Sequence, residues 1–199
     1  MIKAVIFDIG GVLVDQKLLV ERFIRIFKPK DNKKFWDYLN MEAVPLCKGE
    51  MTEAKFWKVI CNKYNVKYFP KNLWTPDFEK LTKINHKVLN IAKSLKTKYK
   101  IGIISNTITS HVKVNRKRRL FDIFDAVILS CEVNLTKDKK EIFLLAAKRL
   151  KVEPEECIFI DDVNDFVETA ESAGMKGILF KNSAQLNKEL KRILKPKII

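Results

Sequence analysis

Five short apolar segments constrain the fold of this 199-residue chain more than any other feature of its sequence. Helical patterns separate the last four of them. Short, continuous apolar strands that alternate with helices are typical of a parallel sheet covered on both faces. The five expected strands are Ala4–Phe7, Lys100–Ile104, Ala126–Leu129, Cys157–Ile160 and Gly177–Phe180. The sequence therefore predicts an α/β fold with a doubly wound, Rossmann-like parallel sheet of about five strands.

A long helical segment interrupts this alternation between the first and second expected strands. It is much too long for one crossover helix, and its aromatic residues recur at helical spacing, as in Phe23 to Phe27 and Phe56 to Ile60. These stripes favour a small helical core over a cofactor-binding surface. We therefore expect an α/β core domain, residues 1–15 and 82–199, with an inserted α-helical domain at residues 16–81.

The charge balance is strongly basic, with 39 lysine and arginine residues against 24 acidic residues and a formal charge of +15. Such an excess suits nucleic acid, an anionic surface or a small anionic substrate. The densest basic run, Lys113–Arg119, lacks interleaved aromatic residues and favours a solvated helix face, so nucleic acid is not the expected partner.

Targeting and redox signals point to the cytoplasm. No apolar run approaches the length of a membrane span, and the N-terminus lacks the pattern of a signal peptide. The four cysteines are far apart and form no C-x-x-C pair, which favours structural thiols over a disulfide or a zinc site. We expect a soluble cytoplasmic protein without membrane contact; its oligomeric state is not predicted.

Polar residues follow four of the expected strands. Asp8, the pair Ser105-Asn106 and the adjacent acids Asp161-Asp162 stand at the ends of the first, second and fourth strands, and Lys137 lies in the segment that follows the third. In a doubly wound sheet, ligands bind beyond the carboxyl ends of the strands, where the strand order reverses. If the segments share one sheet, these side chains converge on one edge.

This set of residues has a chemical logic. Clustered carboxylates repel one another unless a lysine or a divalent cation balances them, and oxygen ligands suit magnesium. Gly10 and Gly11 let the backbone approach a phosphate closely. Ser105 can donate a hydrogen bond to a phosphoryl oxygen and Lys137 can neutralise one. Asp8 is then placed to attack phosphorus and form an aspartyl-phosphate.

Five segments carry a resemblance to a known superfamily. They are Phe7–Asp15, Ile103–Thr107, Ser130–Lys137, Phe159–Asp162 and Ala173–Ile178, which together span most of the chain. The sequence resembles the haloacid dehalogenase superfamily, and most of all its phosphatases with a small helical cap after the first strand. Together the segments are specific for the superfamily but not for a substrate.

The resemblance implies a role for each of the matching residues. Asp8 is the expected nucleophile, and Ser105 and Lys137 bind the transferring phosphoryl group. The residues expected to bind the substrate are Gly10, Gly11, Ser105, Asn106 and Lys137. The expected Mg²⁺ ligands are Asp8, the backbone carbonyl of Gly10, Asp161 and Asp162. We expect Asp162 to ligate directly and Asp161 to act through water or by orientation, although the reverse assignment stays open.

Three positions depart from the family pattern. Gly10 stands where many family phosphatases have a second aspartate, which protonates the leaving oxygen and then activates water. This leaves three alternatives open: slow turnover, another acid, or lost catalysis. Asp138 follows the lysine where proline is common, and Phe166 occupies the usual place of an asparagine, although Asn164 is nearby.

Three functions compete on these grounds. The favoured one is a magnesium-dependent phosphohydrolase acting on a small phosphorylated metabolite through an aspartyl-phosphate. A metal-independent haloacid dehalogenase would tolerate Gly10, but the paired acids would disfavour its anionic substrate. A non-catalytic binding or regulatory protein would also explain Gly10 and the basic surface.

Overall fold

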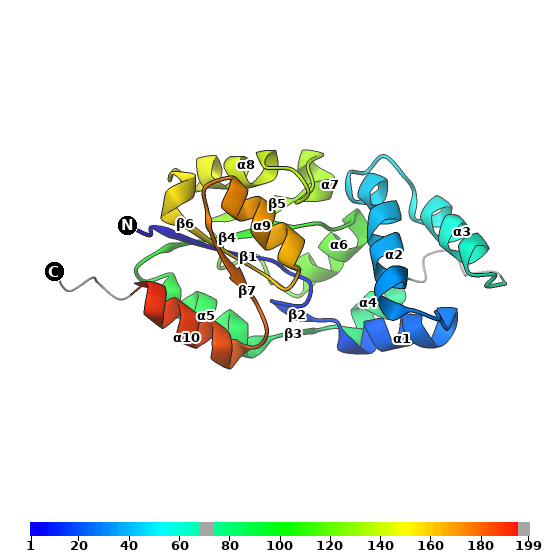
Figure 1. Ribbon diagram of the computed structural model, residues 1–199. Helices are drawn as coiled ribbons and strands as arrows, with labels where there is room; N and C mark the ends of the chain where they lie inside the picture. The colour runs from blue at the N-terminus through cyan, green and yellow to red at the C-terminus, as the bar shows by residue number, and fades with distance from the viewer. Residues whose placement is uncertain (68–73, 195–199) are drawn as a thin grey trace.

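The computed structural model describes residues 1–67 and 74–194 and contains a five-stranded sheet between two layers of helices (Figure 1). Its strands are β1 (Ala4–Phe7), β4 (Lys100–Ser105), β5 (Ala126–Leu129), β6 (Cys157–Asp161) and β7 (Lys176–Leu179). Their order is β5-β4-β1-β6-β7, and all neighbouring pairs are parallel. The predicted doubly wound α/β fold is confirmed, with the first strand at the centre.

Helices cover both faces of the sheet, which explains why its strands are apolar apart from polar residues at their ends. In β1, Ala4 and Ile6 pack in a core cluster with residues of α8 and α9, whereas Val5 and Phe7 pack in a second cluster with residues of α5, α6 and α10. All four side chains are fully buried. The helices of this part of the chain are α5 (His86–Leu95), α6 (Thr109–Lys117), α7 (Ser130–Val133), α8 (Glu141–Leu150), α9 (Asn164–Ser172) and α10 (Ser183–Leu194), with a 3-10 turn η1 (Pro154–Glu156).

Four helices lie beyond the carboxyl ends of the sheet strands, on the right of Figure 1. They are α1 (Lys17–Phe27), α2 (Asn32–Cys47), α3 (Glu53–Lys63) and α4 (Trp74–Leu81). Their contacts are largely aromatic: the Phe35 ring centroid lies 5.3 Å from that of Phe27 and 5.1 Å from that of Tyr64, and Trp57 stacks on Phe27 at 6.1 Å. The aromatic stripes form a helical core, as expected. Residues 68–73 of the predicted insertion lie outside the described part of the chain.

A short antiparallel ribbon carries the chain between the sheet and these four helices. Its strands, β2 (Val14–Asp15) and β3 (Lys83–Ile84), have two residues each, which is too short for a periodic pattern, and the sequence did not reveal them. Asn85 fastens the ribbon to the loop after β1, because its backbone N–H donates to the carbonyl of Leu13 at 2.8 Å and its side chain to that of Val12 at 3.2 Å. The two segments that connect the sheet to these four helices therefore lie side by side.

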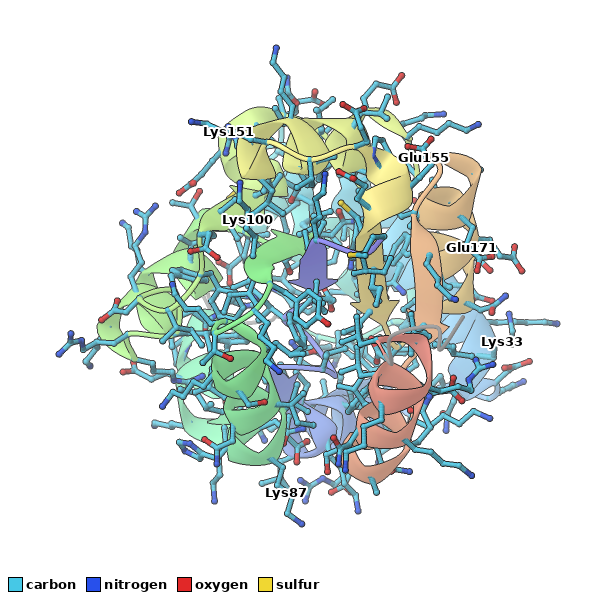
Figure 2. The ribbon with its side chains drawn as sticks, turned by 90° about the vertical axis from the view of Figure 1, so that its left-hand side faces the viewer. Lys33, Lys87, Lys100, Lys151, Glu155 and Glu171 are labelled. Atoms are coloured by element: carbon cyan, nitrogen blue, oxygen red, sulfur yellow. The ribbon has the colours of Figure 1, made fainter. Side chains whose placement is uncertain are left out.

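Basic side chains lie on several sides of the molecule. Lys33, Lys87 and Lys151 point outward on different sides of the molecule (Figure 2). Within the basic run on α6, Lys117 pairs with Glu79 and Arg116 with Glu132. Carboxylates of neighbouring segments thus pair with two cations of this run. None of the helices in the described ranges is long and apolar enough to cross a membrane, and all four cysteines are free thiols.

Candidate active site

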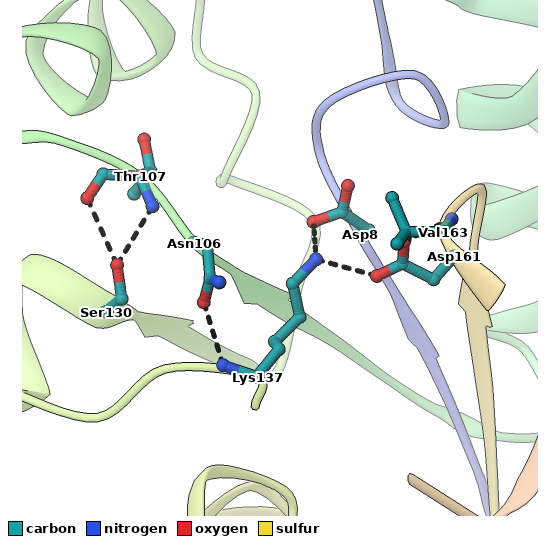
Figure 3. A network of polar contacts seen from close by, with 7 residues as sticks. All are labelled: Asp8, Asn106, Thr107, Ser130, Lys137, Asp161 and Val163. Atoms are coloured by element: carbon teal, nitrogen blue, oxygen red, sulfur yellow. Dashed lines mark hydrogen bonds and ion pairs between the residues drawn. The ribbon is translucent and has the colours of Figure 1, made fainter. Parts of the chain in front are cut away.

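The carboxyl ends of β1 and β6 bring three acids together around one lysine. Carboxylate oxygens of Asp8, Asp161 and Asp162 lie within 4.8 Å of one another. The Lys137 side chain enters this cluster from the loop after α7, and its Nζ lies 2.8 Å from Oδ1 of Asp8 and 2.6 Å from Oδ2 of Asp161 (Figure 3). The convergence expected at this edge of the sheet is therefore present for the acids and the lysine.

Strand geometry places the two buried acids. Asp8 is the residue after β1, and its backbone N–H continues the ladder by donating to the carbonyl of Ile160 at 2.9 Å. Asp161 ends β6 and is fully buried, with Oδ2 paired to Lys137 and Oδ1 accepting from the backbone N–H of Val163 at 2.9 Å. Both oxygens of Asp161 thus have partners within the protein.

Two further contacts, besides the ion pairs with Asp8 and Asp161, hold Lys137 in place. Its backbone N–H donates to Oδ1 of Asn106 at 2.9 Å, and its Nζ lies 4.6 Å from the ring centroid of Phe166. The lysine side chain is only 3% exposed. Phe166 therefore covers the amine with an aromatic face, a favourable contact for a cation. Asn164, the other asparagine near the acidic pair, is exposed and donates to Glu168 instead.

The loop after β4 contributes the remaining polar residues of this edge. Ser105 is the last residue of β4, in register with Leu129 of β5, and is almost fully buried. Beyond Asn106, Thr107 is tied to the start of α7, because its N–H donates to Oγ of Ser130 at 2.9 Å and its carbonyl accepts from that hydroxyl at 3.1 Å (Figure 3). This double contact fixes the loop that carries Asn106.

The two glycines after Asp8 differ in their surroundings. Gly11 has a φ of +77°, which favours glycine, and a Cβ at this position would overlap the carboxylate of Asp162. At Gly10, a Cβ would lie 2.8 Å from Nε2 of Gln16. The carboxamide of Gln16 thus occupies the space beside the second position after Asp8. A lone glutamine gives no sequence signal, and Gln16 was not among the predicted site residues.

The electrostatics of the cluster follow from burial and from its excess of acids. Burial raises the pKa of Asp8 to about 7; Lys137 opposes this rise, and Asp161 and Asp162 add to it. Burial of the carboxyl and the charge of Asp161 raise the pKa of Asp162 to about 6. Burial lowers the pKa of Lys137, but the facing carboxylates of Asp161 and Asp8 outweigh it, so the net pKa is raised. The lysine therefore stays charged.

One ammonium cannot balance three carboxylates, so the cluster favours an additional cation. The available donors are all carboxylate oxygens, which suit a hard cation such as Mg²⁺. The described part of the chain has no second group of metal-ligating side chains of this kind. The residues thus fit the predicted metal, and the nearby lysine suits an anionic ligand.

Comparisons with known proteins agree with this geometry. A family model of haloacid dehalogenase-like hydrolases matches residues 2–174. D-ribitol-5-phosphate phosphatase of Bacteroides thetaiotaomicron is 26% identical over 207 residues, covering 98% of this chain and 99% of the relative. The phosphorylated carbohydrates phosphatase of Thermotoga maritima is 28% identical over 182 residues, covering 88% of this chain and 83% of the relative.

Solved structures share the fold. The structure of a haloacid dehalogenase (HAD) family enzyme from Bacteroides thetaiotaomicron, in complex with magnesium and inorganic phosphate, has a TM-score of 0.70 at 25% identity and covers 91% of this chain and 95% of its own. A HAD phosphatase from Thermococcus onnurineus has a TM-score of 0.68 at 20% identity with full coverage of both chains, a likeness of fold alone. The match to the family model, together with the predicted order of strand-end residues, shows that this chain belongs to the haloacid dehalogenase-like hydrolases.

Proposed function

We propose that the protein is a magnesium-dependent phosphohydrolase that acts on a small phosphorylated metabolite through an aspartyl-phosphate intermediate. The observation that carries this proposal is the contact of 2.8 Å between Asp8 and the amine of Lys137 at the tip of the central strand. A nucleophilic carboxylate beside a fixed cation is what transfer of a phosphoryl dianion requires.

The proposed reaction has two displacements at phosphorus. In the first, a carboxylate oxygen of Asp8 attacks phosphorus, a new O–P bond forms, and the bond to the leaving oxygen breaks. In the second, a water-derived oxygen attacks the same phosphorus, which releases inorganic phosphate and restores the Asp8 carboxylate. Lys137 neutralises charge on the phosphoryl oxygens in both steps, and the Ser105 hydroxyl donates to one of them.

The metal ligands follow from which oxygens are free. Asp161 already has both oxygens engaged, by Lys137 and by the N–H of Val163. We therefore assign direct ligation of Mg²⁺ to Asp8, to Asp162 and to the backbone carbonyl of Gly10, and an orienting role to Asp161. A bound Mg²⁺ would withdraw charge from the phosphoryl oxygens and favour the ionised form of Asp8.

The helical insertion, residues 16–81, is the proposed cap domain over this site. A cap excludes water from the reaction and selects the leaving group. The two phosphatase relatives act, by their names, on D-ribitol 5-phosphate and on phosphorylated carbohydrates. Small polyol and sugar phosphates are accordingly the first substrates to test.

The proposal is tested by phosphate release from p-nitrophenyl phosphate and from a panel of polyol and sugar phosphates, with Mg²⁺ or with a chelator. Turnover that requires Mg²⁺ is the expected result. Failure to release phosphate from every substrate would overturn the proposal. Halide release from 2-haloacids that survives chelation would identify a dehalogenase instead. Salt-sensitive binding of nucleic acid without turnover would identify a non-catalytic protein.

A further inference from the structure

The carboxamide of Gln16 occupies the place that an acidic side chain at position 10 would fill. A Cβ on Gly10 would lie 2.8 Å from Nε2, 3.3 Å from Cδ and 3.4 Å from Oε1 of Gln16, so the whole amide group borders this position. Gly10 is two residues from Asp8, and Cα atoms two residues apart are separated by at most about 7.6 Å. Gln16 thus presents a donor and an acceptor beside the second residue after the proposed nucleophile.

This amide has no evident structural task. Gln16 is the N-cap residue of α1, but its side chain makes no capping hydrogen bond. Its carboxamide forms no hydrogen bond with the part of the chain that the structure describes, and the residue is half-buried. Asp15 caps the start of the helix instead, by accepting from the N–H of Lys17 at 2.9 Å. A polar group in this position is available for water or substrate.

The carboxylates of the cluster have other tasks. Asp8 is the proposed nucleophile, Asp161 has both oxygens engaged within the protein, and Asp162 is a proposed metal ligand. None of these three is left to protonate the leaving oxygen. Glutamine cannot supply a proton at neutral pH, but it can hold a water molecule through its N–H and C=O groups.

We propose that the Gln16 carboxamide binds the water molecule that protonates the leaving oxygen, an inference that rests on the proposed function. When Asp8 attacks phosphorus, the leaving alkoxide takes a proton from this water and departs as an alcohol. The hydroxide that remains attacks phosphorus of the aspartyl-phosphate, and the bond to Asp8 breaks. The sum of both steps is phosphate monoester plus water giving alcohol plus hydrogen phosphate, so no other proton donor is required.

The test compares how much kcat/KM falls, when the Gln16 amide is removed, for two substrates with different leaving groups. The 4-nitrophenolate of p-nitrophenyl phosphate is stable without a proton, whereas the alkoxide of glycerol 3-phosphate is not. For Gln16→Ala we expect kcat/KM for glycerol 3-phosphate to fall by at least about 10-fold, and that for p-nitrophenyl phosphate by less than about 3-fold, since proton transfer contributes on the order of 10²–10⁴-fold. Lys17→Ala, an exposed neighbour on α1, is the matched control and keeps both values.

Two further variants add an acid near the leaving group, and the first of them keeps the inference falsifiable if Gln16→Ala is unstable. Gln16→Glu retains the shape and adds an acid, so glycerol 3-phosphate turnover should acquire a loss at high pH that wild type lacks. The double variant Gly10→Asp/Gln16→Ala removes the amide and introduces an aspartate. The ratio of kcat/KM for glycerol 3-phosphate to that for p-nitrophenyl phosphate should then return to the wild-type value.

Each outcome separates the inference from the proposed function. Equal losses on both substrates in Gln16→Ala, no loss on either, or a pH profile of Gln16→Glu that matches wild type would overturn the role of Gln16 while wild-type turnover still supports the phosphohydrolase. A wild-type protein that hydrolyses neither substrate, nor any other phosphate, would overturn both.

Discussion

The carboxyl edge of the sheet and the helical insertion are both closely packed, but by opposite kinds of interaction. At the edge, three carboxylates cluster around one ammonium, which pairs with two of them, and Asp8, Lys137 and Asp161 are almost fully buried. In the insertion, aromatic rings such as Phe35 and Trp57 fill the space between helices. Burying the charged groups at the edge therefore costs desolvation free energy, whereas the insertion gains stability from the burial of apolar side chains.

Stability and chemistry should therefore reside in different parts of the molecule. Changing a charged group at the edge should alter turnover strongly and stability in either direction. Changing a ring in the insertion should lower stability and leave the chemistry largely intact. Four variants or conditions test that separation.

Asp8→Asn should abolish turnover, with a loss of at least about 10³-fold in kcat, because the amide cannot attack phosphorus. The free energy of unfolding should not fall, because a buried carboxylate is removed while Asp161 still pairs with Lys137. Steady-state kinetics and urea unfolding measure the two effects. Asp165→Asn, an exposed acid on α9, serves as control. Retained turnover would refute Asp8 as the nucleophile.

Lys137→Met should destabilise the metal-free protein by about 3–5 kcal/mol, because it leaves buried acids without their cation. Mg²⁺ should recover part of this loss, and turnover should remain low because the phosphoryl oxygens lose a positive partner. Urea unfolding with and without Mg²⁺ provides the measurement, with the exposed Lys139→Met as control. An unchanged stability would show that the ion pairs of Lys137 contribute little.

Phe35→Ala should cost about 3–4 kcal/mol of stability through the cavity it leaves among Phe27, Trp36 and Tyr64. Its kcat on p-nitrophenyl phosphate should fall far less than that of Asp8→Asn. Met41→Ala on the same helix is the control, since that side chain is 60% exposed. A loss of turnover as large as that of Asp8→Asn, without unfolding, would contradict the proposed separation.

The metal-free protein should lose stability as the pH rises from about 4 to 7. The pKa of Asp8 is raised from 3.8 to about 7 in the folded protein, so the folded state holds a proton that the unfolded chain releases in this range. A tenfold change in proton affinity is worth about 1.4 kcal/mol, and we expect the free energy of unfolding to decline by at least that amount relative to Asp8→Asn. Mg²⁺ should remove this decline. The measurement is urea unfolding at several pH values in the presence of a chelator. If the free energy of unfolding rose with pH relative to that of Asp8→Asn, the raised pKa of Asp8 would be contradicted.

Much of the sheet could be predicted because both of its faces are buried. The bounds of β1 and β5 match the prediction, and β4 and β6 each extend by the polar residue that closes them, Ser105 and Asp161. These residues pair in the ladder and also face the site, so the apolar pattern ends one residue before the strand does. Helix α10 and the β2–β3 ribbon were not predicted.

The clustering of the acids and the lysine at one edge of the sheet was predictable, whereas their contacts were not, and the roles of these residues stay predictions. The order of strand-end residues identified Asp8, Lys137, Asp161 and Asp162. It did not show that Asn106 accepts from the backbone of Lys137, or that Phe166 covers the amine. Both contacts join segments that only the tertiary fold brings together, which a linear pattern does not encode.

The unequal surroundings of Gly10 and Gly11 also determine which sequences can be reached from this one. The neighbour of Gly10 is the end of a flexible side chain, which can rotate away, so a new side chain at position 10 finds room. Gly11 combines a left-handed backbone with the carboxylate of Asp162 at the place of any Cβ. A mutational library of the loop should therefore return diverse residues at position 10 and glycine alone at position 11. A single substitution at position 10 can therefore place an aspartate beside the proposed nucleophile while the protein stays folded.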